Sequence, residues 1–431
     1  MDILEIIDKK RLSKTLSKEE IAYFVKGYTN GSIPDYQMSA LLMAICINGM
    51  NEQETFYLTE QMILSGEVLN LSNIDGLTVD KHSTGGISDT TTIPLIPILA
   101  CAGLKSVKMS GGGLGFTGGT ADKLQVFENI NITPNINDAI SQVKEIGCAM
   151  CTQSSKLAPA DKKIYALRDT TSTVESMPLI AASVMSKKIA CNNDIIVLDV
   201  KCGNGAFMKD AKSAKELSKI MVRIGKNFNK KVQALITDMS QPLGNGIGCS
   251  LEIKDAIEVL QGKQSLLSNL VKEIAIETMV LSEMYTYKTA NEKYQEIIST
   301  KQGLQKLKEL VEYQGGNFDS TMSKISSLKP TDVFVAEQDG YIASYNAQNL
   351  GYLVRDMGGG RKEIDDKINL DCGIYAYKKI GDKVTKGEVL FDIYNMENKL
   401  SIPEIKATLA SCFVISPKKV KPKTLVYSII K

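Results

Sequence analysis

Three glycine-rich turns in the middle of the chain, each after a short run of apolar and β-branched residues, constrain the fold most strongly. The runs are residues 77–79, 106–109 and 195–200, and the turns are residues 83–86, 110–113 and 202–205. Helical stretches follow the turns. Because strand, tight turn and helix in alternation produce a mainly parallel sheet covered by helices, we expect a central α/β domain.

The segments on either side predict two further domains. The first 65 residues are helical in pattern, with a capping box at Ser17 and Glu20. After Pro330 short strands alternate with glycine turns, which predicts a small α+β domain. Within it, residues 379–390 resemble the turn of biotinyl- or lipoyl-type hybrid domains without their Met-Lys-Met carrier motif, so we expect a barrel-sandwich-hybrid-like element. The predicted domains are residues 1–65 with 160–192 (helical), 70–155 with 193–330 (α/β) and 335–431 (α+β).

Composition excludes several classes of partner. Lys and Arg number 51 and Asp and Glu 49, so a net charge of +2 gives no electrostatic reason to expect nucleic acid or an anionic membrane. The longest apolar stretch, residues 93–104, contains two prolines and is too short to span a bilayer, and the first residues do not resemble a signal peptide. Nine irregularly spaced cysteines, including Cys148 and Cys151, are typical of reduced, buried residues. We expect a cytoplasmic protein.

The first candidate site surrounds His82, the single histidine of the chain. Histidine titrates near neutrality, and this one stands between Lys81 and a glycine turn, as a proton donor beside an anion site would. The glycine turns meet at the carboxyl edge of the predicted sheet, where backbone N–H groups and helix N-termini bind anions. Neither a phosphate loop with Gly-Lys-Ser/Thr nor a dinucleotide fingerprint is present, which favours phosphate or a phosphorylated sugar. The alternatives are a surface histidine and ordinary tight turns. The predicted anion ligands are Lys81, Ser83, Thr92, Ser110 and Thr120.

The second candidate site lies in the helical segment of residues 158–190. Arginine is scarce, with five residues in the chain, so Arg168 in an apolar helix suggests a need for its planar fork of donors. Ser183 and Lys187 are four residues apart and share one helical face. Together these groups could bind a flat ring with carbonyl and imide groups. A solvated, salt-bridged helix is the alternative.

Three motifs extend this reading to a family. Residues 80–86 (DKHSTGG), 109–124 (MSGGGLGFTGGTADKL) and 159–169 (PADKKIYALRD) resemble the signatures of pyrimidine-nucleoside and thymidine phosphorylases, and the likeness covers essentially the whole chain. The resemblance implies a pentosyltransferase that cleaves a pyrimidine nucleoside with phosphate to free base and pentose 1-phosphate. It implies no organic cofactor and inversion by a single displacement, without a nucleophilic side chain.

The resemblance also implies residue roles, a hinge and a dimer. Phosphate would bind the five anion ligands given above, and His82 would face O2 of the base. Lys108 is the residue of family members with broad pyrimidine specificity, so we expect cleavage of uridine, thymidine and deoxyuridine. Hinge closure near residues 65–70, 155–163 and 190–195 and a homodimer through the helical domain are also implied. The implied base ligands are Tyr165, Arg168, Ser183 and Lys187, with His82, Arg168 and Lys187 catalytic. A monovalent cation such as K⁺ would bind Ser88, Thr90, Leu243, Gly246 and Asp255.

Two positions depart from the family pattern. Gly112 stands where the family has arginine and Phe116 where it has histidine, which puts turnover or substrate identity in question. Two other functions stay open. An anthranilate-type phosphoribosyltransferase shares the fold and the glycine-rich loops, but would need acidic Mg²⁺ ligands and no third domain. A non-catalytic nucleoside-binding relative is the other, although Lys81, His82 and Arg168 are retained.

Overall fold

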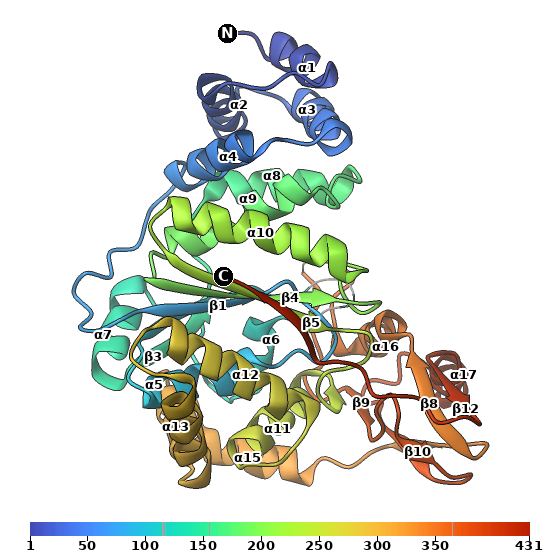
Figure 1. The fold of residues 1–431 in the computed structure, drawn as a ribbon. Coiled ribbons are helices and arrows are strands. Elements are labelled where there is room, and N and C mark those ends of the chain that lie inside the picture. Colours follow the sequence, from blue (N-terminus) through green and yellow to red (C-terminus); the bar gives the residue numbers. More distant parts are fainter. Residues whose placement is uncertain (114–115, 117, 155, 364) are drawn as a thin grey trace.

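A computed structural model describes the chain except residues 114–115, 117, 155 and 364. Its N-terminal part is helical, and α8 and α9 return to it from the middle of the chain (Figure 1). Ser17 and Glu20 form the predicted capping box ahead of α2. Phe24, Leu41 and Ile164 share one apolar core, so the two helical segments form one unit. The helices are α1 (Ile3–Arg11), α2 (Lys18–Asn30), α3 (Asp35–Asn48), α4 (Glu52–Leu64), α8 (Pro159–Thr170) and α9 (Met177–Ala190).

The central sheet is mixed and mainly parallel, which confirms the predicted fold class. Strands β1, β4 and β5 are parallel neighbours, as are β2 and β3, and a parallel bridge from Thr78 to Lys105 links the two groups. Strand β13 closes one edge antiparallel to β5. The strands are β1 (Val79–Ser83), β2 (Ser106–Ser110), β3 (Cys148–Thr152), β4 (Ile195–Cys202), β5 (Lys231–Asp238) and β13 (Val426–Ile430).

Strand β1 differs from its predicted bounds. The sequence predicts a strand that ends at Val79, but the strand continues through Asp80, Lys81 and His82 to Ser83. Asp80 and Lys81 are buried, and each has an ion-pair partner, Lys188 and Asp199 respectively. Their charges are therefore compensated inside the sheet, which sequence pattern does not reveal.

Helices cover both faces of this sheet (Figure 1). A large apolar core, which includes Leu99, Val197 and Ile274, lies between the strands and the helices beneath them, and a second core, which includes Leu217 and Ile236, lies under α10. The helices are α5 (Thr92–Cys101), α6 (Thr120–Leu124), α7 (Ile136–Ile146), α10 (Ala211–Asn227), α11 (Cys249–Leu260), α12 (Leu266–Leu281), α13 (Tyr287–Ser299), α14 (Gln302–Tyr313) and α15 (Phe318–Ser327).

The C-terminal part contains two small sheets but is less separate than predicted. Strand β6 (Gly246–Ile247) of the central domain pairs with β9, and the last strand, β13, lies in the central sheet. Its own sheets have the orders β10-β8-β12 and β6-β9-β11-β7. The elements are β7 (Asp332–Val335), β8 (Gly340–Tyr345), α16 (Ala347–Val354), a π-helical turn (Arg355–Gly359), β9 (Gly373–Ala376), β10 (Lys383–Val384), β11 (Val389–Tyr394), α17 (Ile402–Ser411) and β12 (Phe413–Ser416).

The three connections between the helical and α/β parts lie side by side. The Glu67 N–H donates to the Lys156 carbonyl at 2.9 Å, and the Leu69 N–H donates to the Ala190 carbonyl at 2.9 Å. Gly66 is packed so closely that a Cβ would lie 2.2 Å from the Lys156 carbonyl oxygen. Residue 155 of the expected hinge and residues 114, 115 and 117 of the glycine-rich motif lie outside the described residues.

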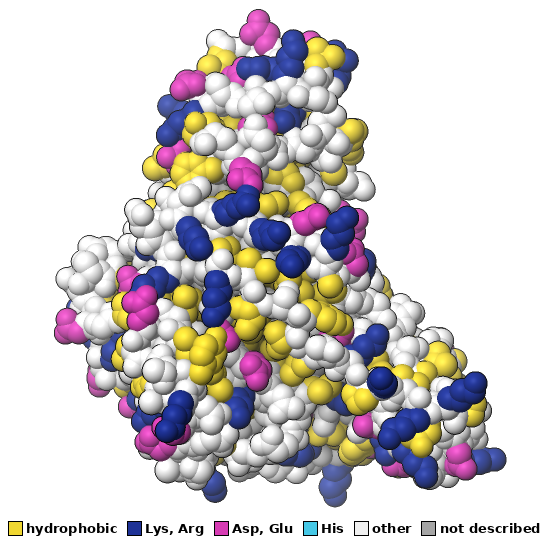
Figure 2. All heavy atoms as spheres, in the orientation of Figure 1, with side chains coloured by type: hydrophobic (Ala, Val, Ile, Leu, Met, Phe, Trp, Pro, Cys, Tyr) yellow, Lys and Arg dark blue, Asp and Glu magenta, His cyan; other side chains and the backbone are white. Residues whose placement is uncertain are grey.

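The surface agrees with the balanced composition. On the face drawn in Figure 2, basic side chains follow the outer side of α10, and acidic and basic side chains are otherwise interspersed. Among the described residues, the helices are too short or too polar to cross a bilayer.

Candidate active site

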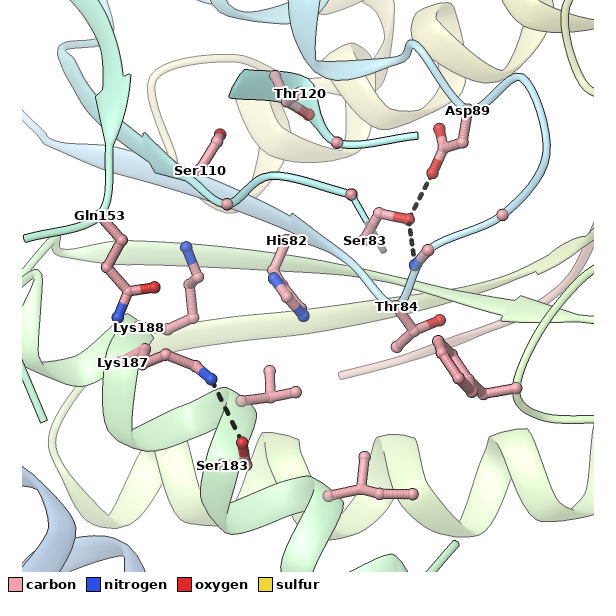
Figure 3. Close-up of a pocket in the computed structure, with 18 of the residues that line it drawn as sticks. His82, Ser83, Thr84, Asp89, Ser110, Thr120, Gln153, Ser183, Lys187 and Lys188 are labelled. Atoms are coloured by element: carbon pink, nitrogen blue, oxygen red, sulfur yellow. Dashed lines mark hydrogen bonds between the residues drawn. The ribbon is translucent and has the colours of Figure 1, made fainter. Parts of the chain in front are cut away.

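A cavity of about 390 Å³ opens at the carboxyl ends of β1 and β2 and is closed on the opposite side by α8 and α9. Figure 3 shows His82 in the middle, with Ser83, Ser110 and Thr120 on one side and Ser183 and Lys187 of α9 on the other. The structure thus brings the two candidate sites of the sequence together in one cavity. All eleven predicted anion-binding, substrate-binding and catalytic residues contribute to its wall: Lys81, His82, Ser83, Thr92, Lys108, Ser110, Thr120, Tyr165, Arg168, Ser183 and Lys187.

The anion side consists of hydroxyl groups and backbone N–H groups. The Ser83 hydroxyl donates to Asp89 Oδ2 at 2.5 Å and accepts from the Gly85 N–H at 3.1 Å, which fixes the turn after β1. The buried Ser110 hydroxyl has no hydrogen-bond partner among the described residues. Thr92 and Thr120 are the first residues of α5 and α6, where the N–H groups of a helix favour negative charge. The Ser110 hydroxyl can therefore donate to an anion directly, whereas Ser83 must first release Asp89.

Buried ion pairs lie directly behind these hydroxyls. Lys81 Nζ lies 3.1 Å from Asp199 Oδ2 and donates to Thr91 Oγ1 at 2.5 Å, and Lys201 Nζ lies 2.8 Å from the same carboxylate. Burial opposes the ionisation of Asp89, but Lys201 and Lys81 hold the pKa of Asp89 well below its usual value. Lys81 thus reaches the cavity wall with its ammonium already paired.

A second charged group lies beside β1. Asp80 Oδ2 accepts from Lys188 at 2.8 Å, and its Oδ1 lies 3.2 Å from Lys108 Nζ. Burial opposes ionisation of Asp80, but the two ammonium groups keep the pKa of Asp80 below its usual value. Burial lowers the pKa of Lys108 to about 8 despite Asp80. Two cations thus share one carboxylate, which leaves positive charge at this end of the cavity.

His82 is neutral in this environment. Burial, followed by the charges of Lys188, Lys108 and Lys187, lowers the pKa of His82 well below 6.5. A neutral imidazole donates one N–H and accepts at its other nitrogen. At neutral pH His82 can therefore act as a hydrogen-bond donor, but it does not begin as an imidazolium.

The base side is built on α8 and α9. Lys187 Nζ donates to Asp161 Oδ2 at 2.6 Å and to Ser183 Oγ at 3.3 Å, so Ser183 and Lys187 do share a helical face. Arg168 is 1% exposed, which rules out the solvated-helix alternative for this residue. Its guanidinium donates to the carbonyls of Thr173, Val174 and Leu179. These three bonds leave two of its five N–H groups for another acceptor.

Comparison with known proteins identifies the family. A family model described as the glycosyl transferase family, a/b domain, matches residues 75–315, and its helical bundle domain matches residues 4–66. The pyrimidine nucleoside phosphorylase C-terminal domain matches residues 341–416. Proteins named pyrimidine-nucleoside phosphorylase from Staphylococcus epidermidis and Bacillus subtilis are 46% and 44% identical, each over 100% of both chains. The chain belongs to the pyrimidine-nucleoside phosphorylase family. The predicted family and transferase class are thereby confirmed.

A solved structure supports the fold alone. Anthranilate phosphoribosyltransferase from Thermus thermophilus aligns with a TM-score of 0.58 at 15% identity, over 73% of this chain and 100% of that chain. A Geobacillus stearothermophilus pyrimidine-nucleoside phosphorylase, by contrast, is 44% identical over 99% of both chains. The match to the phosphorylase family, which includes the C-terminal domain, therefore covers essentially the full length of this chain.

The structure shows what surrounds the two departures from the phosphorylase pattern. A Cβ at Gly112 would lie 3.4 Å from Nη1 of Arg361, so a guanidinium from the C-terminal domain lies against this glycine. The Phe116 ring lies 5.8 Å from the ring of Phe207 and 5.5 Å from that of Tyr352. Aromatic packing thus surrounds the position where the family pattern has histidine.

The predicted cation ligands divide into two groups. Thr90 donates to Glu252, whereas Ser88 donates to the Gly246 carbonyl at 2.5 Å. Asp255 accepts the Asn245 and Gly246 N–H groups through one oxygen, and burial raises the pKa of Asp255 to about 6. Lys379 Nζ donates to the carbonyls of Pro242 and Gly244, on either side of Leu243. An ammonium thus bonds to the carbonyls on either side of Leu243, and the cation site stays a prediction.

Sequence reasoning missed five residues of the cavity or its support. Asp161 was inside a quoted motif without a role, and Lys188 follows a predicted base ligand directly. For Asp89, Gln153 and Lys201 the sequence pattern indicates a role in the site less strongly. Asp199 and Lys201 lie two positions apart near the end of β4 and therefore share one face of the strand, a pattern that could have indicated a buried polar cluster.

Proposed function

We propose that the protein catalyses the reversible phosphorolysis of uridine, thymidine and deoxyuridine to the free base and ribose or deoxyribose 1-phosphate, for pyrimidine nucleoside salvage. The observation that carries this proposal is the position of His82. It lies between hydroxyl groups at helix N-termini and the Ser183–Lys187 pair of α9, in one cavity (Figure 3). A displacement in which an anion attacks one face of a carbon while a polar ring departs from the opposite face fits this arrangement.

Phosphate binds on the sheet side, held by Ser83, Thr92, Ser110 and Thr120, with Lys81 behind them. The unpartnered Ser110 hydroxyl supports this assignment, since a buried hydroxyl needs a hydrogen-bond partner and phosphate oxygens would supply it. Lys81 contributes an ammonium that is already paired with Asp199, and not a free cation.

The pyrimidine binds between Tyr165, Ser183, Lys187 and the free N–H groups of Arg168. Lys187 lies over the Tyr165 ring at 5.9 Å, so an aromatic face and a cation are adjacent, as recognition of a flat polar ring requires. His82 donates its N–H to O2 of the base as a neutral imidazole, which replaces the charged donor that the sequence suggested.

Cleavage of the C1′–N1 bond places positive charge on the sugar and negative charge on the ring. The N–H groups of His82, Arg168 and Lys187 stabilise the ring as this charge develops, which lowers the barrier. Phosphate attacks C1′ from the opposite face as N1 departs. The displacement therefore inverts C1′.

The two halves of the site belong to different domains, so catalysis includes closure of the helical part onto the sheet edge. The adjacent connections at Glu67, Lys156 and Ala190 support a common hinge. Tyr36 and Ile47 of α3 are both 74% exposed, which supports a homodimer through the helical domain. All nine cysteines are free, which supports a cytoplasmic location.

A spectrophotometric assay tests the proposal. Purified protein with uridine is expected to release uracil, seen as an ultraviolet change, only when inorganic phosphate is added. A second assay replaces uridine and inorganic phosphate with anthranilate and phosphoribosyl pyrophosphate, the substrates of the phosphoribosyltransferase alternative, together with Mg²⁺. Nucleoside binding by calorimetry without phosphate-dependent release would instead identify a non-catalytic relative. Addition of K⁺ to the first assay tests the predicted cation.

A further inference from the structure

The glycine-rich wall of the cavity depends on one carboxylate from outside the loop. Residues 110–113 and 118–120 include five glycines, which contribute no side chains to hold the wall in place. Asp122 Oδ2 accepts the Gly113 N–H at 2.6 Å, and the Gly111 carbonyl accepts the Ala121 N–H at 3.3 Å. Asp122 lies on α6, two residues after Thr120. This carboxylate therefore fixes the spacing between the two ends of the loop.

Asp122 needs a partner of opposite charge because it is buried. Its side chain is 3% exposed, and an isolated buried carboxylate is strongly unfavourable. The partner is Arg361 of the C-terminal domain, whose Nη1 donates to Asp122 Oδ1 at 2.7 Å and lies 3.5 Å from the Gly113 carbonyl. Arg361 Nε donates to the Asp366 carbonyl at 3.1 Å, which holds the guanidinium in place. One arginine thus links the C-terminal domain to the loop.

Gly112 makes this contact possible. A Cβ there would lie 3.4 Å from Arg361 Nη1 and 3.5 Å from both carboxylate oxygens of Asp122. The ion pair therefore lies directly against the backbone of the loop, on the wall that also carries Ser110 and Thr120.

We propose that Arg361 is a positioning residue for phosphate: by pairing with Asp122 it sets the geometry of the phosphate loop and neutralises a carboxylate near the phosphate. The inference rests on the proposed phosphorolysis. It gives the C-terminal domain a part in a site whose other residues belong to the first two domains. Without Arg361, the Asp122 carboxylate would lie uncompensated against the loop that faces the incoming dianion, which would weaken phosphate binding while leaving the nucleoside side unaffected.

The test measures KM for phosphate and for uridine separately, with calorimetric titration of inorganic phosphate alone as a second readout. Arg361→Ala is expected to raise KM for phosphate on the order of tenfold, the loss of one charged hydrogen bond, with little change in KM for uridine. In the double variant Arg361→Ala with Asp122→Asn the carboxylate charge is gone, so phosphate affinity is expected to recover in part. Arg361→Lys keeps the charge but not the fork, and should fall between the wild type and Arg361→Ala.

Arg355→Ala is the matched control. Arg355 belongs to the same segment, and its side chain is 22% exposed against 19% for Arg361, but its partner Asp356 is the next residue. This variant should retain the wild-type KM values for phosphate and uridine.

An unchanged phosphate KM in folded Arg361→Ala, or an equal rise of both KM values, would overturn the inference. If Arg361→Ala does not fold, Arg361→Lys supplies the same comparison. Absence of phosphate-dependent uracil release by the wild type would instead refute the proposed function. Calorimetric titration of inorganic phosphate would still test whether Arg361 affects phosphate binding.

Discussion

Substitution of Lys108 by methionine separates recognition of ribose from recognition of the base. Lys108 Nζ donates to the Met109 carbonyl at 2.8 Å and lies 3.2 Å from Asp80 Oδ1. An ammonium has three N–H groups, so these contacts leave one for the cavity that Lys108 helps to form. We expect this N–H to bind the 2′-hydroxyl of a ribonucleoside, which a deoxyribonucleoside lacks, and so to account for the predicted cleavage of uridine.

The expected effect follows from that single bond. A hydrogen bond to a charged group contributes about 1.5–3 kcal/mol. Its loss should lower kcat/KM for uridine roughly 10- to 150-fold, at about 1.4 kcal/mol per tenfold change, and leave deoxyuridine within a few-fold of the wild type. Asp80 retains Lys188 at 2.8 Å, so the carboxylate is not left unpaired and the fold should persist.

The assay is phosphorolysis of uridine and deoxyuridine side by side, with thermal unfolding as a check on folding. Lys105→Met, three residues earlier and outside the cavity wall, is the control and should change neither substrate. The wild type should cleave both nucleosides at comparable rates. Equal losses for uridine and deoxyuridine in Lys108→Met, or an inability of the wild type to cleave uridine, would refute the reasoning.

Three further predictions concern His82, the aromatic contacts and the hinge. His82→Ala should lower kcat on the order of tenfold with little effect on KM for phosphate, whereas His82→Gln, which keeps a neutral N–H, should retain most activity; unchanged kcat in His82→Ala contradicts a donor role. Since the unfolded chain binds a proton at His82 near pH 6.5 and the folded chain does not, wild-type stability relative to His82→Gln should fall below that pH, by up to about 1.4 kcal/mol per pH unit, in unfolding titrations. A double-mutant cycle of Phe116→Ala and Tyr352→Ala should give a coupling of about 0.5–1.5 kcal/mol, and additivity would exclude a contribution of the ring pair. Gly66→Ala should destabilise by about 1–3 kcal/mol, because its Cβ would meet the Lys156 carbonyl; an unaltered melting temperature would show that the hinge yields.

Local signals in the sequence predicted the features that depend on local chemistry. The capping box at Ser17 begins a helix as expected, and Ser183 and Lys187 meet because four residues make about one helical turn. The fold class followed from the alternation of strands, glycine turns and helices. These features need only short-range geometry, so one sequence was sufficient.

Features that depend on distant pairing were not predictable in this way. Strand β3 (Cys148–Thr152) consists mostly of small or sulfur-containing residues without alternation, and it is a strand because it pairs with β2. Strand β13 pairs with β5 across nearly 200 residues, so its sequence alone could not assign it to the central sheet. Arg361 reaches Asp122 across 239 positions. Such partners become visible only when the chain is folded.

In the proposed reaction, the distribution of charge in the cavity favours electrostatic stabilisation of the base over that of phosphate. Behind the phosphate loops three ammonium groups face three carboxylates: Lys81, Lys123 and Lys201 with Asp89, Asp199 and Glu252. On the other side of the cavity four basic side chains, Lys108, Arg168, Lys187 and Lys188, face the carboxylates of Asp80 and Asp161, and Glu175 also lines the cavity. In the proposed reaction, phosphate held by neutral donors keeps the electron density that a nucleophile needs, whereas the excess of positive charge stabilises the anion that forms on the departing ring. Burial, together with the charges of Lys188, Lys108 and Lys187, lowers the pKa of His82 well below its usual value, so in the proposed reaction the positive charge comes from the lysines and Arg168 rather than from the single histidine.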